Sequence, residues 1–413
     1  MKLSLFFALL VFQLGFSQQR TCKSNSHMQK LMTDPVAKQK YLDLQNRFEI
    51  ELSKLQSNNN HSAKNTNQTL LIPVAVHFPN VATNSTEKNC LRQLAQNQIA
   101  TLNADFNATN ADISLWTPAV SAFYPDTNIG SINVKFVIAN QNHSPGTGLA
   151  NGELAVTFGT NFLNDADNDS QWVGYMNIVV RVAGGLGYSP LPGSPNEGAT
   201  VVINYDAFGS GSGCVGYTPS GDYNLGRTLS HEIGHFFNLD HTFGNSLCNQ
   251  SNTDDVNDTP QCTGSGGCPA AGSVAGCVAG QKSLTMNYMD YTDDACMYML
   301  TLGQTTRMQA YLNVISNQFA TNVLSNENFE FKNFALSPNP NNGTFRISFT
   351  PESNENIEII VYDISGRKIH NKTFQNSDMF NQELQVNTIS SGIYFVNIQN
   401  GENKMIKRII IKN

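Results

Sequence analysis

Apolar residues recur along the chain with different periods, and the changes of period divide the sequence into regions. Over residues 18–56 the apolar positions follow a helical spacing, which predicts a helix with one buried stripe. The segment Ser57–Thr69 is polar and of low complexity, so it cannot build a core and is predicted to be a linker. The stripe consists of Tyr41, Leu44, Phe48, Leu52 and Leu55.

Apolar runs in the next region predict buried strands. Leu70–Phe78 is the first, and INVKFVI, MNIVVRV and ATVVINY follow, separated by long stretches of Gly, Asn, Ser and Pro. Helices are predicted near Glu87–Phe106, over Leu225–Leu239 and over Gly303–Ile315. This pattern is typical of an α/β enzyme with elaborate loops.

From Phe334 onward, short alternating strands replace these patterns. The runs TFRISF, IEIIVYDI, IYFVNI and KRIIIK are joined by turns such as SGRK and SSG. Such alternation predicts a separate all-β module, most simply a sandwich.

The first residues carry the features of a secretory signal. One lysine precedes an apolar run from Leu3 to about Phe16, and Gly15 and Ser17 occupy the small-residue positions of a cleavage site. A buried N-terminal helix is the alternative. No other stretch approaches about 18 uninterrupted apolar residues, so we expect no stable membrane insertion.

Charge and cysteine content narrow the class of protein. The net charge of −7 leaves no basic surplus to neutralise phosphates, which argues against nucleic acid as a partner. In an exported protein, clustered cysteines indicate disulfides, and no pair has the CxxC spacing of a cysteine zinc site. The cluster comprises Cys214, Cys248, Cys262, Cys268, Cys277 and Cys296, whereas Cys22 and Cys90 lie apart.

The segment HEIGHFFNLDH, which begins at His231, has the spacing of a zinc site. On a helix His231 and His235 project from one face, with Glu232 beside them. A continuous helix would carry His241 about 15 Å along the axis, too far for Zn–N bonds of about 2.1 Å. The chain must therefore reverse after about Asn238. Asparagine enters the required left-handed conformation at a cost of about 1 kcal/mol or less, so it can replace the usual glycine.

A second motif lies downstream in NYMDYTDD. A tight turn bearing a methionine beneath a trihistidine zinc is the other hallmark of metzincin peptidases, and Met289 fits it. A methionine alone is more often an ordinary core residue, so the prediction rests on the occurrence of Met289 together with the three histidines.

Together, HEIGHFFNLDHTFG, DVNDTPQ, GCP and NYMDYTDDACM followed by LTLGQTTRM resemble the motifs of the pappalysin (cytophagalysin) family of metzincins. The resemblance covers about Leu70–Asn322. It implies an α/β (α+β) catalytic domain with a twisted mixed sheet and an active-site helix. It also implies a single catalytic Zn²⁺ with His231, His235 and His241 as its ligands. Asn238, in place of glycine, is the one clear departure from the family pattern.

The resemblance also assigns roles in catalysis. Glu232 is the expected general base, Met289 the Met-turn residue, and Tyr291 a donor to the developing oxyanion. Zinc lowers the pKa of a bound water towards about 7, Glu232 takes its proton, and the resulting hydroxide attacks a peptide carbonyl. An extended substrate is expected to add to the edge of the sheet at the ATVVINY strand.

Substrate preference depends on Asp294. Some pappalysin relatives have an acid here, at the floor of the pocket for the residue after the scissile bond, and an acid favours Arg or Lys. The alternative is a solvated or structural aspartate.

The resemblance implies Cys248–Cys277 and Cys268–Cys296 as disulfides, and leaves Cys90, Cys214 and Cys262 without assigned partners. The segment DDVNDTP offers hard oxygen ligands for a candidate Ca²⁺ site, as in relatives, or is simply a hydrated acidic turn. The candidate calcium ligands are Asp254, Asp255, Asp258 and the carbonyl of Thr259.

Near the N-terminus, QRTCKS resembles the Arg-x-Cys segment of prodomains in this family. In that role Cys22 is a latency switch whose thiolate occupies the open position on zinc; a free thiol without a role is the alternative. Cleavage within Ser57–Thr69 would then release the active form.

The C-terminal segments FALSPNPNNGTFRISF, VYDISGRKI and SGIYFVNIQNGENKMIKRIIIKN resemble the sorting domain of the type IX secretion system. The resemblance implies passage across the outer membrane and makes the secretion machinery a partner. A carbohydrate- or matrix-binding sandwich is the alternative.

We therefore predict a secreted or cell-surface zinc endopeptidase, made as a latent zymogen, that acts on proteins or peptides. The alternatives are a zinc-containing binding protein or adhesin, and a zinc hydrolase of non-peptide bonds. The predicted organisation is a signal peptide (1–17), propeptide and linker (18–66), catalytic domain (67–322), linker (323–333) and sandwich (334–413).

Overall fold

The computed structural model forms two compact units, Met1–Ser325 and Asn326–Asn413, each described by itself. The predicted signal peptide, most of the first linker and part of the second lie outside the described residues, so these boundaries stay predictions. No helix among the described residues is long and apolar enough to cross a membrane. The structure describes residues 20–58, 69–159, 167–244, 248, 254–324, 331–351, 353–364, 366–386, 390–401 and 403–412.

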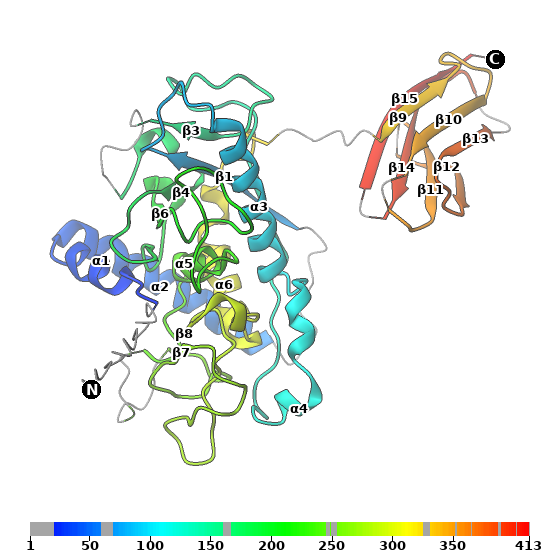
Figure 1. The fold of residues 1–413 in the computed structure, drawn as a ribbon. Coiled ribbons are helices and arrows are strands. Elements are labelled where there is room, and N and C mark those ends of the chain that lie inside the picture. The colour runs from blue at the N-terminus through cyan, green and yellow to red at the C-terminus, as the bar shows by residue number, and fades with distance from the viewer. Residues whose placement is uncertain are drawn as a thin grey trace, which may run out of the picture. The chain divides into compact units, whose positions relative to one another are not determined.

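The N-terminal segment of the first unit forms two helices, α1 (Ser24–Leu31) and α2 (Pro35–Asn58). Three members of the predicted apolar stripe, Leu44, Phe48 and Leu52, are buried in the main core. Helix α2 packs along α6 (Leu302–Ile315), the closing helix of the unit (Figure 1). The segment is thus part of the folded unit.

A mixed sheet forms the centre of this unit, in the order β2-β1-β4-β6-β5, with β3 also paired to β1. All pairings are parallel except that of β5 with β6. The strands are β1 (Leu70–Phe78), β2 (Val134–Ile138), β3 (Val156–Phe158), β4 (Met176–Val180), β5 (Gly187–Tyr188) and β6 (Thr200–Ile203).

The prediction that ATVVINY forms the edge of the sheet is wrong. ATVVINY contains β6, which lies between β4 and β5, and the edge beside it is the two-residue strand β5. This strand follows a glycine-rich loop and has no apolar run, so periodicity could not detect it.

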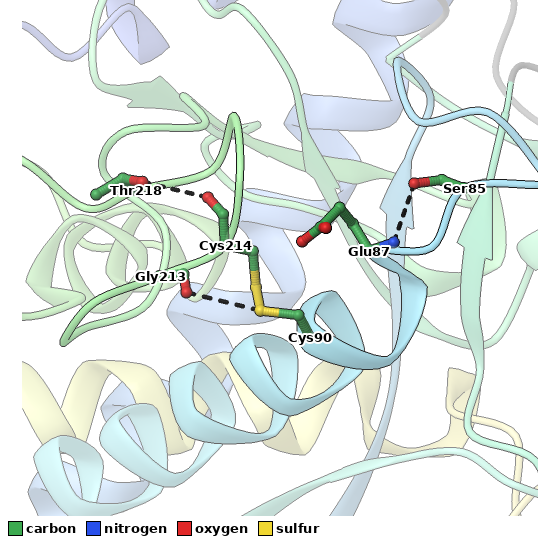
Figure 2. The surroundings of a disulfide bond; sticks show 6 residues. All are labelled: Ser85, Glu87, Cys90, Gly213, Cys214 and Thr218. Atoms are coloured by element: carbon green, nitrogen blue, oxygen red, sulfur yellow. Dashed lines mark hydrogen bonds between the residues drawn. A yellow bond between two sulfur atoms is a disulfide. The ribbon is translucent and has the colours of Figure 1, made fainter.

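Helices α3 (Lys88–Phe106) and α5 (Arg227–Phe236) pack against each other, and α3 also contacts β2 and β3. Figure 2 shows a disulfide between Cys90, in the first turn of α3, and Cys214, in the loop that leads to α5. The hydroxyl of Thr218 donates to the Cys214 carbonyl at 3.2 Å and steadies the loop side of the bridge. The short elements of the unit are α4 (Pro118–Ser121), β7 (Gly266–Gly267) and β8 (Tyr291–Thr292).

Two further disulfides close the long loop after α5. They join Cys248 to Cys277 and Cys268 to Cys296, the pairs that the family resemblance implied. Cys262 is buried and unbridged.

The second unit is all β, as predicted. Its antiparallel sheets have the orders β13-β10-β9 and β12-β11-β14-β15, and residues from both sheets share one core, which is the arrangement of a sandwich. The strands are β9 (Lys332–Ser337), β10 (Thr344–Thr350), β11 (Ile357–Asp363), β12 (Lys368–Phe374), β13 (Phe380–Gln385), β14 (Gly392–Asn400) and β15 (Asn403–Ile411).

Candidate active site

Helix α5 and the turn after it bring three histidines together. The helix ends at Phe236, and Asn238 adopts φ +69°, the left-handed conformation that the reversal requires. The Nε2 atom of His241 consequently lies 3.2 Å from that of His231 and 3.1 Å from that of His235.

Backbone carbonyls fix the orientation of two of these rings. His231 Nδ1 lies 2.7 Å from the Tyr288 carbonyl, and His235 Nδ1 lies 2.7 Å from the Leu239 carbonyl. A carbonyl only accepts, so each Nδ1 must carry the proton, and each Nε2 keeps its lone pair for the centre of the group. Burial lowers the pKa of His235 to about 4 and lowers those of His231 and His241 as well, so the imidazoles are neutral at pH 7.

The histidine group fits a tetrahedral zinc ion. Ligand atoms about 2.1 Å from zinc lie about 3.4 Å from one another in a tetrahedron, close to the separations of the Nε2 atoms. Lone pairs facing one another at this distance repel unless a cation lies between them. Cys22 lies at the same group, since its Sγ and the three histidine nitrogens all lie within 4.8 Å of one another.

Glu232 is buried beside the histidines and contacts the N-terminal segment. Its Oε2 accepts a hydrogen bond of 3.1 Å from the Ser24 hydroxyl and lies 3.5 Å from Cys22 Sγ. Burial raises the pKa of Glu232 to about 8, although the contacts with Cys22 and Ser24 and the charge of Arg20 lower it. The Glu232 carboxylate thus contacts Cys22 and Ser24 of the N-terminal segment.

Met289 lies in a turn that contacts α5 and the residue after His241. It is fully buried, and its carbonyl accepts from the backbone N–H of Thr242 at 3.2 Å, which ties the turn to the residue after His241. A Cβ added to Gly234 would lie only 2.4 Å from Met289 Sδ, so α5 needs glycine there for this close approach.

Tyr291 closes the other side of the histidine group. The centroid of its ring lies 4.8 Å from that of His241 and 5.9 Å from that of His231. Burial raises the pKa of the phenol above its ordinary value, so it stays protonated and able to donate.

Arg20 fills a buried pocket whose floor is Asp294. One guanidinium NH₂ donates to Asp294 Oδ1 at 2.5 Å, the other donates to Thr228 Oγ1 at 3.3 Å, and Nε donates to the Thr292 carbonyl at 3.1 Å. The Tyr223 ring covers the guanidinium at 4.9 Å from its centroid.

Asp294 also stabilises α5. Its Oδ2 accepts from the backbone N–H groups of Leu225 and Arg227 at 2.9 and 3.1 Å, at the start of the helix. The solvated aspartate expected as one alternative is wrong, because Asp294 is fully buried. A pocket floor and a structural aspartate are both compatible with its contacts.

The segment that carries Arg20 and Cys22 lies along the sheet edge. Cys22 forms a parallel bridge with Gly187 of β5, in which Lys23 N donates to the Gly187 carbonyl at 3.1 Å. Leu186 N donates to the Thr21 carbonyl at 3.0 Å. An extended peptide thus adds to β5 within the histidine cleft.

The candidate calcium ligands do not converge. Asp254 accepts hydrogen bonds from the Thr259 hydroxyl, whereas the Asp258 carboxylate accepts from Thr301 Oγ1 at 2.6 Å and from Gly303 N at 2.9 Å, at the start of α6. Among the described residues, a metal-type side-chain group forms only at the histidines. These contacts do not support calcium, which stays a prediction. Asp255, another candidate ligand, contacts α6 through its backbone carbonyl, which accepts a hydrogen bond from the Arg307 guanidinium.

Sequence reasoning missed several contributors to the site. In the sequence, Arg20 stands out only as part of the Arg-x-Cys segment. No local sequence pattern marks Ser24 or Tyr223, because their partners are distant along the chain. Gly234 could have been noticed as a glycine inside a predicted helix, where it is unfavourable without a packing reason.

Family models match both units. The model described as Pregnancy-associated plasma protein-A matches residues 167–313, and the model described as Secretion system C-terminal sorting domain matches residues 335–412. An extracellular metalloprotease of Podospora anserina is 38% identical over 141 residues, which cover 32% of this chain and 45% of that protein. One of Verticillium alfalfae is 40% identical over 131 residues, or 31% of this chain and 46% of that protein. The chain spans less than half the length of these curated relatives.

The similarity to a solved structure extends over more of the chain. A promirolysin mutant of Tannerella forsythia is 30% identical, with a TM-score of 0.53, and the match covers 72% of this chain and 95% of that one. The chain belongs to the pappalysin family of metallopeptidases. This confirms the resemblance and the predicted fold class. A catalytic zinc is implied for a pappalysin, and His231, His235 and His241 form the group that could hold it. The sorting domain indicates secretion or a location at the cell surface.

Proposed function

We propose that this pappalysin is a secreted zinc endopeptidase that is made latent by its N-terminal segment and prefers Arg or Lys after the scissile bond. The observation that carries the proposal is the convergence of three histidine Nε2 atoms next to Glu232, in a cleft where Arg20 binds Asp294. The type IX secretion machinery is the proposed export partner, on the strength of the sorting domain.

A zinc ion held by His231, His235 and His241 would act as a Lewis acid that polarises the peptide carbonyl and lowers the pKa of the attacking water towards about 7. Glu232 accepts the proton of the water and later returns it to the leaving amine. The Tyr291 hydroxyl donates to the oxyanion, since its ring packs against those of His231 and His241. The backbone of β5 aligns the extended substrate in the direction opposite to residues 21–23, so that the residue after the scissile bond reaches the place of Arg20.

The proposed substrate preference follows from the contacts of Arg20. A guanidinium that enters this pocket meets a buried carboxylate, a hydroxyl, a carbonyl and an aromatic face. Lysine can reach the carboxylate but cannot make the same set of bonds with a single ammonium group. A substrate arginine would take this place once the N-terminal segment has left.

Latency follows from the same contacts. Cys22 lies at the histidine group, and Ser24 bonds the general base. Zinc deprotonates a coordinating thiol, so the Cys22 thiolate would fill the position that water needs.

The test is to digest the N-terminal segment of the full chain completely and to incubate the product with a peptide library. Mass spectrometry should locate cuts predominantly before Arg and Lys, and a chelator should stop them. No cleavage by the zinc-loaded protein would reject the peptidase function, and cuts without preference for basic residues would reject the role of Asp294 in specificity.

A further inference from the structure

The residue that departs from the family pattern has a partner in the N-terminal segment. Gln45 of α2 donates from Nε2 to Asn238 Oδ1 at 2.8 Å, and Asn238 Nδ2 donates to Gln45 Oε1 at 3.1 Å. The two amides thus exchange both hydrogen bonds that a facing pair can make. Asn238 is only 4% exposed and Gln45 is partly buried, so water has limited access to the pair.

This pairing needs a side chain at the turn. The positive φ of Asn238 favours glycine, which would satisfy the backbone equally well but offers Gln45 nothing to bond. The asparagine therefore combines the backbone conformation that brings His241 to the other histidines with an amide that faces α2.

Apolar and charged contacts surround the pair along α2. Phe48 lies beneath the Arg307 guanidinium, 5.0 Å from its ring centroid, and meets the Tyr311 ring edge-on at 6.3 Å. Both partners belong to α6. At the other end, Lys40 Nζ lies 2.6 Å from Glu197 Oε1. These contacts are separate from those that Arg20 and Cys22 make in the cleft.

We propose that Asn238 is a docking residue for α2, and that the surface formed by the Asn238 turn and α6 holds residues 35–58 as a second inhibitory contact. This rests on the proposed latent peptidase function. The consequence is that cutting the linker does not by itself release the enzyme, because the severed segment stays bound through α2 and keeps Cys22 in the cleft. Activation then needs dissociation or destruction of the severed segment.

The experiment uses the full chain with a recognition site for a sequence-specific protease inserted within residues 59–68. After the cut, size-exclusion chromatography shows whether the two pieces co-elute, and serial dilution followed by a peptide-cleavage assay gives their dissociation constant. The wild-type pieces should co-elute and stay latent until diluted. Gln45→Ala should raise the dissociation constant about 10-fold.

Gln39→Ala is the matched control, because Gln39 is an exposed glutamine of the same helix that bonds Asp43 within α2. It should leave the dissociation constant unchanged. Asn238→Gly should weaken binding as Gln45→Ala does, and the double variant should be no weaker than either single variant, since both remove the same pair. Zinc content checks that the turn of Asn238→Gly still forms.

The proposal is overturned if the wild-type pieces separate as soon as the linker is cut, if Gln45→Ala binds like Gln39→Ala, or if the two effects add. Co-elution is measured without activity, so the outcome stays separate from the proposed function. Pieces that dissociate as expected but never cleave peptides, even after complete digestion of the N-terminal segment, would reject the peptidase function and leave the docking role intact.

Discussion

The histidine cleft has two walls that are built differently. One wall, formed by α5, the Asn238 turn and the Met289 turn, is held by backbone groups from residues 225–288: carbonyls orient His231 and His235, and N–H groups bind Asp294. The other wall is residues 20–24, which contact the functional side chains themselves.

The first wall therefore determines the geometry of the site, and the second wall determines what occupies it. The backbone bonds of the first wall remain when the cleft is emptied, so the site is organised before a substrate arrives. The contacts of residues 20–24 are those proposed for a substrate and for water, so the second wall can be exchanged. The following predictions break one wall at a time.

Loss of a metal ligand should have the largest effect. His235→Ala removes one of three converging nitrogens, so zinc content should fall from about one ion per chain to near zero and cleavage to the background rate. A chelator should do the same to the wild-type protein, and added zinc should restore activity to the wild type alone. Full activity of metal-free protein would contradict the proposed mechanism.

Glu232→Gln should come next, because it keeps the shape of the first wall but removes the base. We expect kcat to fall by about 10³- to 10⁴-fold with zinc content unchanged. Metal analysis alongside the peptide assay separates this result from loss of the site. Retention of turnover would remove Glu232 from the proposed role.

A substitution in residues 20–24 should disrupt the second wall and leave the first wall intact. Arg20→Ala breaks a buried ion pair with Asp294, and we expect spontaneous activity of the full chain to rise by about 100-fold, because the segment leaves the cleft more readily. Lys23→Ala is the matched control, since Lys23 is an exposed basic residue of the same segment. Equal latency of both variants would show that Arg20 does not hold the segment.

Sequence patterns predicted the first wall better than the second. The spacing of His231, His235 and His241 imposes a reversal near residue 238 by geometry alone, and the structure has positive φ at Asn238. The second wall depends on tertiary contacts across more than 200 residues, such as Ser24 with Glu232, which no local pattern encodes.

The fold divides in the same way. An apolar run predicted β1, and helical periodicity predicted α3 and α6 closely, whereas the edge strand β5 has only two residues and was missed. The disulfide between Cys90 and Cys214 spans 124 residues and could not be assigned by spacing either. Elements that carry their own periodicity can be predicted, and those defined by a distant partner cannot.

Asp294 contacts both walls, because it binds the start of α5 and Arg20. A substitution there separates its role in specificity from its structural role. Asp294→Asn keeps a side chain that can bond the start of α5 but loses the charge. We expect kcat/KM to fall about 30-fold for peptides with Arg after the scissile bond and only slightly for those with Leu. The neighbouring Asp293→Asn is the control, and an equal fall for both peptides would indicate a structural role alone.

The smallest effect concerns the packing within the first wall. Alanine normally stabilises a helix by about 1 kcal/mol relative to glycine, yet a Cβ at Gly234 meets Met289 Sδ at 2.4 Å. We expect Gly234→Ala to destabilise the first unit by about 1–3 kcal/mol, measured as a lower Tm. In a Met289→Ala background the obstacle is gone, so the same substitution should raise Tm. If Gly234→Ala lowers Tm equally in both backgrounds, contact with the methionine is not the reason for the glycine.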